Sequence, residues 1–530
     1  MLRDMRYFAK LSKNLPIKYK IDQGYTRQVK SVMDSILNEK NKEIIPVVIG
    51  GNKKYGRLIQ KQFSPIDNKK WICEYSNASE SDLNLFLCNH KQYKESLTSL
   101  SEKDIKIIFQ RASELLDNKY RDLMIAYTIL GQGKSLFEAE VDAICELGDF
   151  WNFNSDYFET ILQKQPFSPI NQFNESVYNP LNGFVASITP FNFTAIGGNL
   201  ATVPLFFRNT TIWKPSKNAI LSNYLVYKIM IEAGMPEEAI SFAPSDPQLF
   251  SNTIIKSPHL GGVLFTGSTN VFDSILENVY GNIKNYNSYP RIVGETGGKN
   301  WHFIDENMDE NDLNKIADKT IQSAFGYSGQ KCSACSIVYI SEKDRHVFVN
   351  LLKKNIDIFK HLNSFKNYGL IDEDSFERTV KVINKIKSDS KRYKLISGGQ
   401  MASSSTHFCE PTIIECSDHS DFVFNQEFFA PILAIYTYDD KMSAMKKCVS
   451  SNNYALTGSV FSKNNTFIRY SREYFKEKCG NFYVNDKSTG SVVGQQPFGG
   501  SGRSGTNDKA GDVNLLYKLF NQQTIKTGSI

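Results

Sequence analysis

The sequence predicts an α/β protein built around an open, doubly wound sheet of parallel strands. Between residues 184 and 280, short apolar segments bounded by turn residues alternate with segments of helical periodicity. Strands and helices that alternate in this way form parallel sheets with crossover helices. With 530 residues, 41% of them hydrophobic and 22% charged, the chain is long enough for two or three globular domains.

Charge and cysteine content exclude several classes of protein. The formal net charge is +6, but Lys and Arg are scattered among nearly as many acids, so no nucleic-acid-binding surface is predicted. No apolar run reaches the roughly eighteen residues that a membrane span needs. The nine cysteines are an odd set with irregular spacing, which is typical of a reducing compartment and not of a disulfide framework.

The first twenty residues are basic, with Lys and Arg interleaved among apolar residues and Asp4 as the single acid. This composition resembles a mitochondrial presequence, although it is poor in serine, and a basic N-terminal arm is the alternative. We therefore expect import into the mitochondrial matrix, with a cytoplasmic location as the second interpretation.

The first half of the chain carries the elements of the predicted sheet. In order, the patterns predict strands broken by turns over 40–74, helices over 101–130 and 136–150, a hairpin over 175–188, strands over 184–188, 210–213, 240–243 and 262–266, and helices over 194–207, 223–233 and 269–280. The turn residues 179–183 predict the hairpin. Glu140 and Asp142 lie on the second helix, where a solvent-exposed edge is the simpler interpretation.

The second half predicts another α/β unit. Its patterns predict strands over 336–340, 411–415 and 431–438, helices over 345–359 and 376–387, loops around Gly398 and over 401–407, and a C-terminal edge strand within 514–527. If that last strand paired with the hairpin over 175–188, it would leave an exposed strand edge, which proteins normally cover.

Three short motifs follow strands of the first sheet. The chain lacks the usual GxGxxG, but TPFNF follows Ile188, KPS follows Trp213 and TGS follows Phe265. Ligands of parallel sheets bind at the carboxyl ends of the strands, where these motifs would lie together. There Lys214 could hold a ribose or phosphate, and the segment 266–268 before a helix suits an anion.

A second candidate centre is Cys332 in FGYSGQKCSACS. Apolar residues from Leu313 to Ala324 predict a helix, capped by Asn311 or Asp312 and ended by Gly326. The helix delivers the cysteine into a glycine-containing turn. Such a thiol is a nucleophile, a metal ligand, half of a disulfide or an ordinary buried apolar group. The chain has a lone CxxC here and no second ligand pair at motif spacing, so no metal site is predicted.

Six motifs together resemble the aldehyde dehydrogenase superfamily: TPFNF (189–193), WKPS (213–216), FTGS (265–268), GETGGKN (294–300), FGYSGQKCSACS (325–336) and NQEFFAPI (425–432). Within it, NDKSTGSVVGQQPFGG (485–500) and SGTNDKAG (504–511) resemble the 1-pyrroline-5-carboxylate dehydrogenases, also called glutamate-semialdehyde dehydrogenases. The resemblance extends from about residue 46 to the C-terminus.

The resemblance implies a fold and an activity. The fold would be a Rossmann-like NAD-binding domain, an α/β catalytic domain and a β-strand arm. The enzyme would oxidise L-glutamate 5-semialdehyde, formed from 1-pyrroline-5-carboxylate, to L-glutamate in the second step of proline degradation. Cys332 would be the nucleophile that forms a thiohemiacetal and then a thioester, Asn192 with the Cys332 amide the oxyanion hole, and Glu295 the general base. A capping role for Asn192 and a surface loop for Glu295 are the alternatives.

The same resemblance implies a cofactor site for NAD. Its residues would be Ile188, Pro190, Phe191, Lys214, Ser216, Phe265, Gly267, Ser268, Glu427 and Phe429. Lys217 departs from the family pattern, because relatives commonly place an acid there that bonds the adenosine 2′-hydroxyl. A lysine cannot accept that bond and could attract a 2′-phosphate, so NADP use stays open beside NAD.

For the substrate, the resemblance implies a carboxylate anchor far from the aldehyde. Its residues would be Phe193, Ser333, Phe498, Gly500 and Ser501, where Phe193 and Phe498 wall the aliphatic part and the other three hold the carboxylate. Relatives more often carry alanine at the position of Ser501, which leaves the exact preference open. Glu140 and Lys331 also match positions that line such a site.

The resemblance also divides the chain. Residues 1–20 would be a presequence or basic arm, 21–174 and 187–299 the NAD-binding domain, 300–484 the catalytic domain, and 175–186 with 512–530 an oligomerisation arm. In this family the arm joins subunits, so we expect a homodimer or a larger homo-oligomer. The functional alternatives are an aldehyde dehydrogenase of broader specificity and a catalytically silent protein of the same fold.

Overall fold

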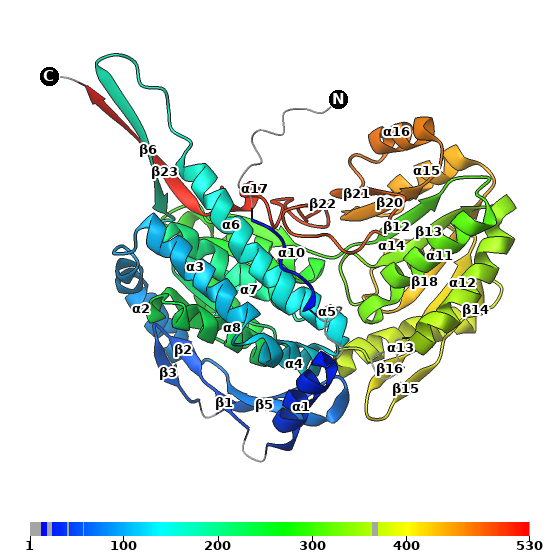
Figure 1. Cartoon of the computed structure of the whole chain (residues 1–530), viewed down its shortest axis with the longest axis horizontal. Helices are drawn as coiled ribbons and strands as arrows, with labels where there is room; N and C mark the ends of the chain where they lie inside the picture. Colours follow the sequence, from blue (N-terminus) through cyan, green and yellow to red (C-terminus); the bar gives the residue numbers. More distant parts are fainter. Residues whose placement is uncertain (1–11, 19–23, 40–41, 57, 363–368, 529–530) are drawn as a thin grey trace.

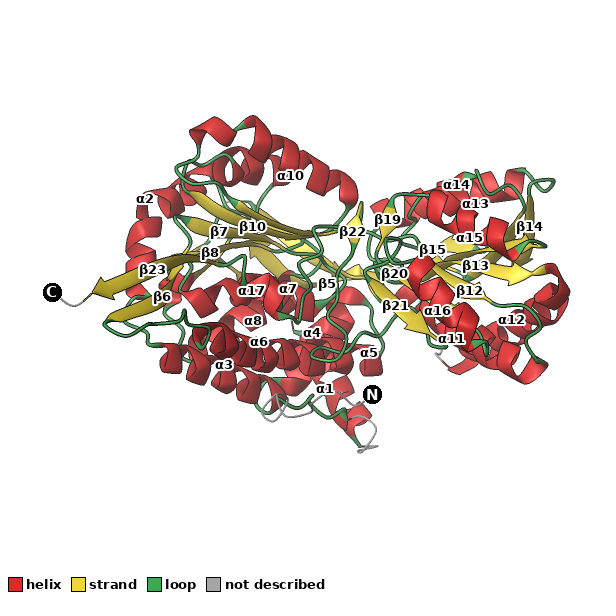
Figure 2. Cartoon of the chain, turned by 90° about the horizontal axis from the view of Figure 1, so that it is seen from above, coloured by secondary structure: helices red, strands yellow, loops and turns green. Residues whose placement is uncertain are grey.

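The computed structural model describes residues 12–18, 24–39, 42–56, 58–362 and 369–528. They form two lobes, each with helices packed on both faces of a seven-stranded sheet, and a two-stranded arm that projects from the first lobe (Figure 1, Figure 2). The predicted α/β fold is confirmed. The domain boundaries stay a prediction.

The sheet of the first lobe has the strand order β11-β10-β7-β8-β9-β2-β3. Its strands are β2 (Val47–Ile49), β3 (Asn52–Lys54), β7 (Phe184–Ile188), β8 (Thr211–Lys214), β9 (Ile240–Phe242), β10 (Leu260–Thr266) and β11 (Arg291–Glu295). From β11 to β9 every neighbouring pair is parallel, as the alternation predicts, and β2 joins in the antiparallel sense.

Helices cover the two faces of this sheet. They include α2 (Glu80–Ser96), α3 (Glu102–Asp117), α4 (Arg121–Gln132), α5 (Leu136–Glu140), α6 (Leu147–Leu162), α7 (Thr194–Thr202), α8 (Ile220–Glu232) and α10 (Thr269–Gly281). A small sheet of β1 (Ile44–Ile45), β4 (Ile59–Ser64) and β5 (Asp67–Ser76) and the helix α1 (Tyr25–Asn38) lie beside them.

The sheet of the second lobe has the order β14-β17-β18-β13-β12-β20-β21. Its strands are β12 (Asn300–Ile304), β13 (Cys335–Ser341), β14 (Tyr393–Ser397), β17 (Thr412–Cys416), β18 (Ile432–Tyr438), β20 (Thr457–Phe461) and β21 (Asn481–Val484). Its helices include α11 (Glu310–Phe325), α12 (Glu342–Leu362), α13 (Glu373–Ser388), α15 (Lys441–Ser450) and α16 (Asn465–Tyr474). A short hairpin of β15 (Met401–Ser403) and β16 (His407–Cys409) replaces the predicted loop over 401–407.

The predicted hairpin over 175–188 is wrong. Its first half belongs to β6 (Gln172–Pro180), which pairs antiparallel with β23 (Phe520–Gly528), whereas its second half is β7 in the main sheet. The turn residues therefore connect strands of two different sheets. The pairing of β6 with the C-terminal strand is confirmed over nine residues.

Two predicted helices also differ from the structure. The helix over 101–130 is broken into α3 and α4, because the Asn118 side-chain amide donates to the Glu114 carbonyl and ends the first helix. The helix over 136–150 contains a π-helical turn, Val141–Glu146, between α5 and α6. Neither Glu140 nor Asp142 lies on an exposed edge, because both are buried.

The described part of the N-terminal segment packs against these helices. The Ser12 amide donates to Asp156, the Leu15 amide to Asp149 and the Lys18 amide to Glu140. Residues 1–11 and 19–20 of the predicted presequence lie outside the described residues. Among those that are described, no helix is long and apolar enough to cross a membrane, and no group of three metal-binding side chains occurs.

Candidate active site

The turn before Cys332 is held in an unusual backbone conformation. The helix α11 begins at its cap Asp309, whose carboxylate accepts from the Asp312 amide at 2.9 Å, so the predicted caps at 311 and 312 are wrong by two or three residues. After Gly326 ends the helix, Tyr327, Ser328 and Gly329 all have positive φ. A Cβ on Gly329 would lie 2.5 Å from the Ala430 carbonyl oxygen, so only glycine fits this close approach.

Asn192, from the first lobe, lies against the loop that carries Cys332. It is 5% exposed and its side-chain amide donates to the Gln330 carbonyl at 3.1 Å. It does not cap α7, since no side chain bonds the first amides of that helix from the cap position, Phe193. Asp142 does so instead, with its carboxylate accepting from the Thr194 amide at 3.0 Å and the Ala195 amide at 2.9 Å.

The Cys332 thiol is buried and surrounded by acids. Burial raises its pKa well above the ordinary value, and the carboxylates of Glu295 and Glu427 raise it further. Hydrogen bonds from the backbone amides of Cys332 and Ser333 act in the opposite direction and lower the pKa. The backbone amides are thus the groups that favour the thiolate here.

Glu295 ends β11 with its carboxylate enclosed in protein. Burial raises its pKa to about 7, while the Lys509 ammonium acts to lower it. Its Oε1 atom has no hydrogen-bond partner among the described residues. A cavity of about 30 Å³, which is the volume of about one water molecule, is lined by Glu295, Thr266, Gly500 and Lys509. A carboxylate with this pKa beside a thiol suits a general base near neutral pH.

The strand-end motifs meet at one edge of the first sheet. Ile188 is the register partner of both Lys214 and Phe265, and Thr266 is the partner of Glu295. The four strands therefore end level with one another. Burial lowers the pKa of Lys214 to about 8. Ser268 caps α10, with its hydroxyl accepting from the Val271 amide at 3.4 Å.

The second lobe contributes Glu427 and Phe429 to this edge. The Gly298 amide donates to the Glu427 carboxylate at 2.9 Å, and a Cβ on Gly297 would lie 2.0 Å from that carboxylate. The Phe429 ring lies edge-on to Phe191, with 5.9 Å between the ring centres, and Phe429 has a φ of 53°. Pro190 and Ser216, also predicted to bind cofactor, are half-buried in the loops after β7 and β8.

The predicted carboxylate anchor lies in a tight glycine turn. Ser501 pairs with Ala455 between two short strands, and a Cβ on Gly500 would lie 2.7 Å from the Ala455 carbonyl oxygen. Phe498 is half-buried and bridges to Ala510, while Ser333 is 7% exposed next to Cys332. Phe193 is half-buried beneath Lys134, whose ammonium lies 4.0 Å from the ring centre.

Glu140 does not face this site. It is fully buried and forms an ion pair with Arg121, whereas Lys331 pairs with Glu138 at 3.3 Å. Sequence reasoning also missed Glu146, which ends the π-helical turn. Burial and Asp142 raise its pKa to about 8, and Glu295 adds to the shift. A π-helical turn often marks a functional site, but its insertion in a helix leaves no simple sequence pattern.

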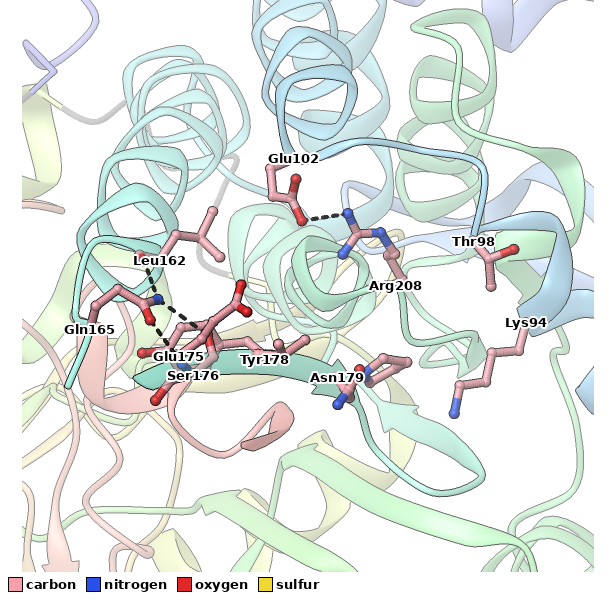
Figure 3. A pocket seen from close by; sticks show the side chains of 12 residues that line it. Lys94, Thr98, Glu102, Leu162, Gln165, Glu175, Ser176, Tyr178, Asn179 and Arg208 are labelled. Atoms are coloured by element: carbon pink, nitrogen blue, oxygen red, sulfur yellow. Dashed lines mark hydrogen bonds and ion pairs between the residues drawn. The ribbon is translucent and has the colours of Figure 1, made fainter. Parts of the chain in front are cut away.

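A larger cavity of about 380 Å³ lies at the base of the arm (Figure 3). Three of the charged side chains that line it have partners: Arg208 pairs with Glu102 at 2.8 Å, and the Lys94 ammonium donates to the Leu181 carbonyl at 2.6 Å. Gln165 bonds the backbone of Ser176 on β6. None of the predicted site residues lines this cavity, which belongs to the attachment of the arm.

Comparison with known proteins shows the family of the chain. The model of the aldehyde dehydrogenase family matches residues 53–525. The chain belongs to the aldehyde dehydrogenase family. The predicted resemblance is thus confirmed, and the chain is an aldehyde dehydrogenase, an oxidoreductase of aldehydes.

Several of the similar proteins are delta-1-pyrroline-5-carboxylate dehydrogenases by name. The mitochondrial delta-1-pyrroline-5-carboxylate dehydrogenase of Homo sapiens is 38% identical over 91% of this chain and 86% of its own length. That of Dictyostelium discoideum is 39% identical over 98% of this chain and 95% of its own length. The Mycobacterium tuberculosis delta-pyrroline-5-carboxylate dehydrogenase, solved with bound NAD, matches this aldehyde dehydrogenase with a TM-score of 0.90, 34% identity, and coverage of 98% and 96% of the two chains.

Proposed function

We propose that this aldehyde dehydrogenase oxidises L-glutamate 5-semialdehyde, the open form of 1-pyrroline-5-carboxylate, to L-glutamate with NAD. The human and Dictyostelium relatives are named for that substrate. The observation that carries the proposal is the position of Cys332 in a loop that Asn192 and Glu295 approach from the other lobe. A thiol, an amide donor and a carboxylate base are the groups that aldehyde oxidation through a thioester requires.

The Cys332 thiolate adds to the aldehyde carbon. The amide donors of Asn192 and the Cys332 backbone bind the oxyanion of the resulting thiohemiacetal, and removing such a donor typically costs about 3 kcal/mol. NAD, when bound, accepts the hydride. Glu295 then takes a proton from the water that hydrolyses the thioester, and the cavity of about 30 Å³ beside it has room for that water.

The residues at the sheet edge fit a dinucleotide. Lys214 and Ser216 would hold the adenosine ribose, Ser268 the pyrophosphate, and Glu427 the nicotinamide ribose. A Cβ on Gly267 would meet the Phe265 ring at 2.6 Å, and Thr266 Oγ1 has no hydrogen-bond partner among the described residues. Glycine before the helix lets backbone amides approach a phosphate closely, which supports this assignment.

The surroundings of Lys217 favour NAD over NADP. Its ammonium lies 3.8 Å from the Asp372 carboxylate and 3.6 Å from the Asp374 carboxylate, both of the second lobe. Lys217 and Asp374 are exposed, whereas Asp372 is half-buried. The two carboxylates offset the positive charge that a 2′-phosphate would need.

We therefore expect Asp374→Asn to improve NADP binding relative to NAD. The pair is exposed, so the change in the ratio of the two Kd values should be about threefold to fivefold, as for an exposed ion pair. Titration of intrinsic protein fluorescence with each dinucleotide measures it without catalysis. Asp440→Asn, on the same lobe, serves as the control, and an unchanged ratio in Asp374→Asn would show that the Asp374 carboxylate plays no part in cofactor choice.

The carboxylate anchor supports the amino-acid aldehyde. The amides of Gly500 and Ser501 and the Ser333 hydroxyl would bind the α-carboxylate, and Phe193 and Phe498 would wall the methylene groups. An anion site together with aromatic side chains suits a short aldehyde that carries a carboxylate.

Assembly and location are part of the proposal. The arm of β6 and β23 carries exposed apolar side chains, including Phe173 at 59% and Ile525 at 37%, which supports a homodimer covering the arm. The names of the curated relatives support the mitochondrial matrix. Since residues 12–18 pack on the helices, any cleavage would precede Ser12.

The proposal also divides the chain into units. These would be the arm, made of residues 175–186 and 512–530, and two domains with boundaries at residues 299 and 484.

The test is the initial rate of NAD reduction with 1-pyrroline-5-carboxylate. We expect turnover with a KM well below that for hexanal, an aldehyde without an α-carboxylate. Similar KM values for both would favour an enzyme of broader specificity. No turnover with either, in protein that binds NAD, would indicate a catalytically silent member of the fold.

A further inference from the structure

We propose that Asn300 is a positioning residue for the reaction: it orients the Cys332 loop by holding the loop's backbone carbonyls. The inference rests on the proposed function only in taking Cys332 as the nucleophile. Asn300 begins β12, which lies between β13 and β20 in the sheet of the second lobe. Neither the thiol nor the substrate carboxylate touches its side chain in this assignment.

The Asn300 side chain forms its hydrogen bonds with backbone groups. Its amide nitrogen donates to the Cys332 carbonyl at 2.7 Å and to the Ala334 carbonyl at 2.9 Å. Its oxygen accepts from the Thr457 amide at 3.0 Å. The residue is 1% exposed, so water does not compete for these groups. One side chain thus ties the nucleophile loop to the neighbouring strand β20.

The carbonyl between those two is also held by side chains. The hydroxyls of Thr457 and Ser488 each donate to the Ser333 carbonyl at 3.4 Å, and Ser488 is further bonded to His302. Three successive carbonyls of the loop therefore accept side-chain donors. Asn300 donates the two shortest of these hydrogen bonds, so we expect it to contribute most to the orientation of the loop.

The hydrogen bond to the Cys332 carbonyl also fixes the orientation of the next backbone amide, that of Ser333. In a trans peptide the C=O and N–H groups point in opposite directions, so the bond from Asn300 to the Cys332 carbonyl sets the direction of the Ser333 N–H. That N–H is one of the two backbone donors that lower the thiol pKa. With the carbonyl released, the peptide plane can rotate and the thiolate loses a fixed donor.

A buried asparagine with three backbone bonds can also serve stability alone, and Asn209 provides the comparison. Asn209 is fully buried, donates to the Pro204 and Leu519 carbonyls at 3.0 and 2.7 Å, and accepts from the Leu181 amide at 2.8 Å. Its bonding pattern matches that of Asn300, but it lies at the base of the arm. Asn209 is therefore a matched control for the cost of removing such a side chain.

The experiment is alkylation of Cys332 by iodoacetamide across pH 6 to 10, in cofactor-free protein and with mass spectrometry to locate the label. A Cys88→Ser background removes the exposed cysteine. In Asn300→Leu we expect alkylation about tenfold slower at pH 8 and an apparent thiol pKa higher by about one unit. Asn209→Leu should lose comparable thermal stability but keep the wild-type profile. Glu295 and Glu427, the charged groups that act on the thiol, are the same in every variant.

Two results would overturn the proposal: a wild-type alkylation profile in folded Asn300→Leu, or an equal slowing in Asn209→Leu. If Asn300→Leu does not fold, Asn300→Ser is measured in its place, and a smaller shift in the same direction is required. Because alkylation needs no aldehyde, a wrong substrate assignment would leave this result unaffected. A wrong nucleophile assignment would show instead as activity retained after Cys332 is removed.

Discussion

Replacement of Cys332 by alanine is expected to lower NAD reduction with 1-pyrroline-5-carboxylate by on the order of 10⁴-fold or more. Without the thiol no thiohemiacetal forms, and the oxyanion donors have no covalent adduct to bind. The thiol makes no structural hydrogen bond to another side chain among the described residues, so the fold should be kept. The initial rate at saturating substrate measures the loss, and fluorescence titration with NAD should give the wild-type Kd.

The neighbouring cysteine provides the control. Cys335 is 1% exposed and its thiol lies on the β13 side of the loop, 3.4 Å from the Ile337 carbonyl oxygen. Cys335→Ala should therefore retain activity within a few-fold. If Cys332→Ala keeps substantial activity, or if Cys335→Ala loses as much, the assignment of the nucleophile is wrong.

Replacement of Glu295 by glutamine is expected to lower the steady-state rate by about 10²-fold to 10⁴-fold, the usual contribution of a general base. Glutamine keeps the shape of the side chain but cannot take a proton from water. Because the thiol is untouched, the first turnover should still form the thioester. Stopped-flow measurement should show a burst of NADH close to one equivalent per active site, followed by a slow phase.

The same residue predicts the pH dependence. The Glu295 pKa is raised to about 7, and the base acts only when deprotonated, so the hydrolysis rate should rise with pH through about 7 and level off above it. At pH 6 only about a tenth of the carboxyl groups would be ionised. The Cys332 pKa is also raised, which adds to the loss at low pH. A wild-type rate that falls as the pH rises from 6 to 8, or normal steady-state turnover in Glu295→Gln, would contradict the assignment.

Local pattern determined much of the fold. The sequence predicts the parallel strands β7, β8, β9 and β10 and the helices between them. The signals for these elements are the spacing of apolar residues and the turn residues, which are both local features of the sequence. The strand-end motifs could be placed together for the same reason, since parallel strands share a carboxyl edge. Cys332, Asn192 and Glu295 were identifiable by their motifs, although their roles remain predictions.

The wrong predictions concern strand pairing and burial, which depend on contacts between segments far apart in the sequence. The turn residues 179–183 predict that the strands on either side pair with each other, but β6 and β7 belong to different sheets. A solvent-exposed edge was the simpler interpretation for Glu140 and Asp142, whereas both are buried and form ion pairs with Arg121 and Lys134. Burying a charged side chain costs less free energy when an oppositely charged side chain is paired with it than when it is isolated.

The sequence by itself determined the family, the reactive residue types and the sheet that carries them, because these depend on short motifs and local periodicity. Only the tertiary structure decided which groups surround the chemistry: Glu138 rather than Glu140 beside Lys331, two acids beside Lys217, and Asn300 beneath the Cys332 loop. Each of these contacts joins segments far apart in sequence. Hydrogen bonds and charges act through space over a few ångströms, and only the folded path brings such segments within that distance.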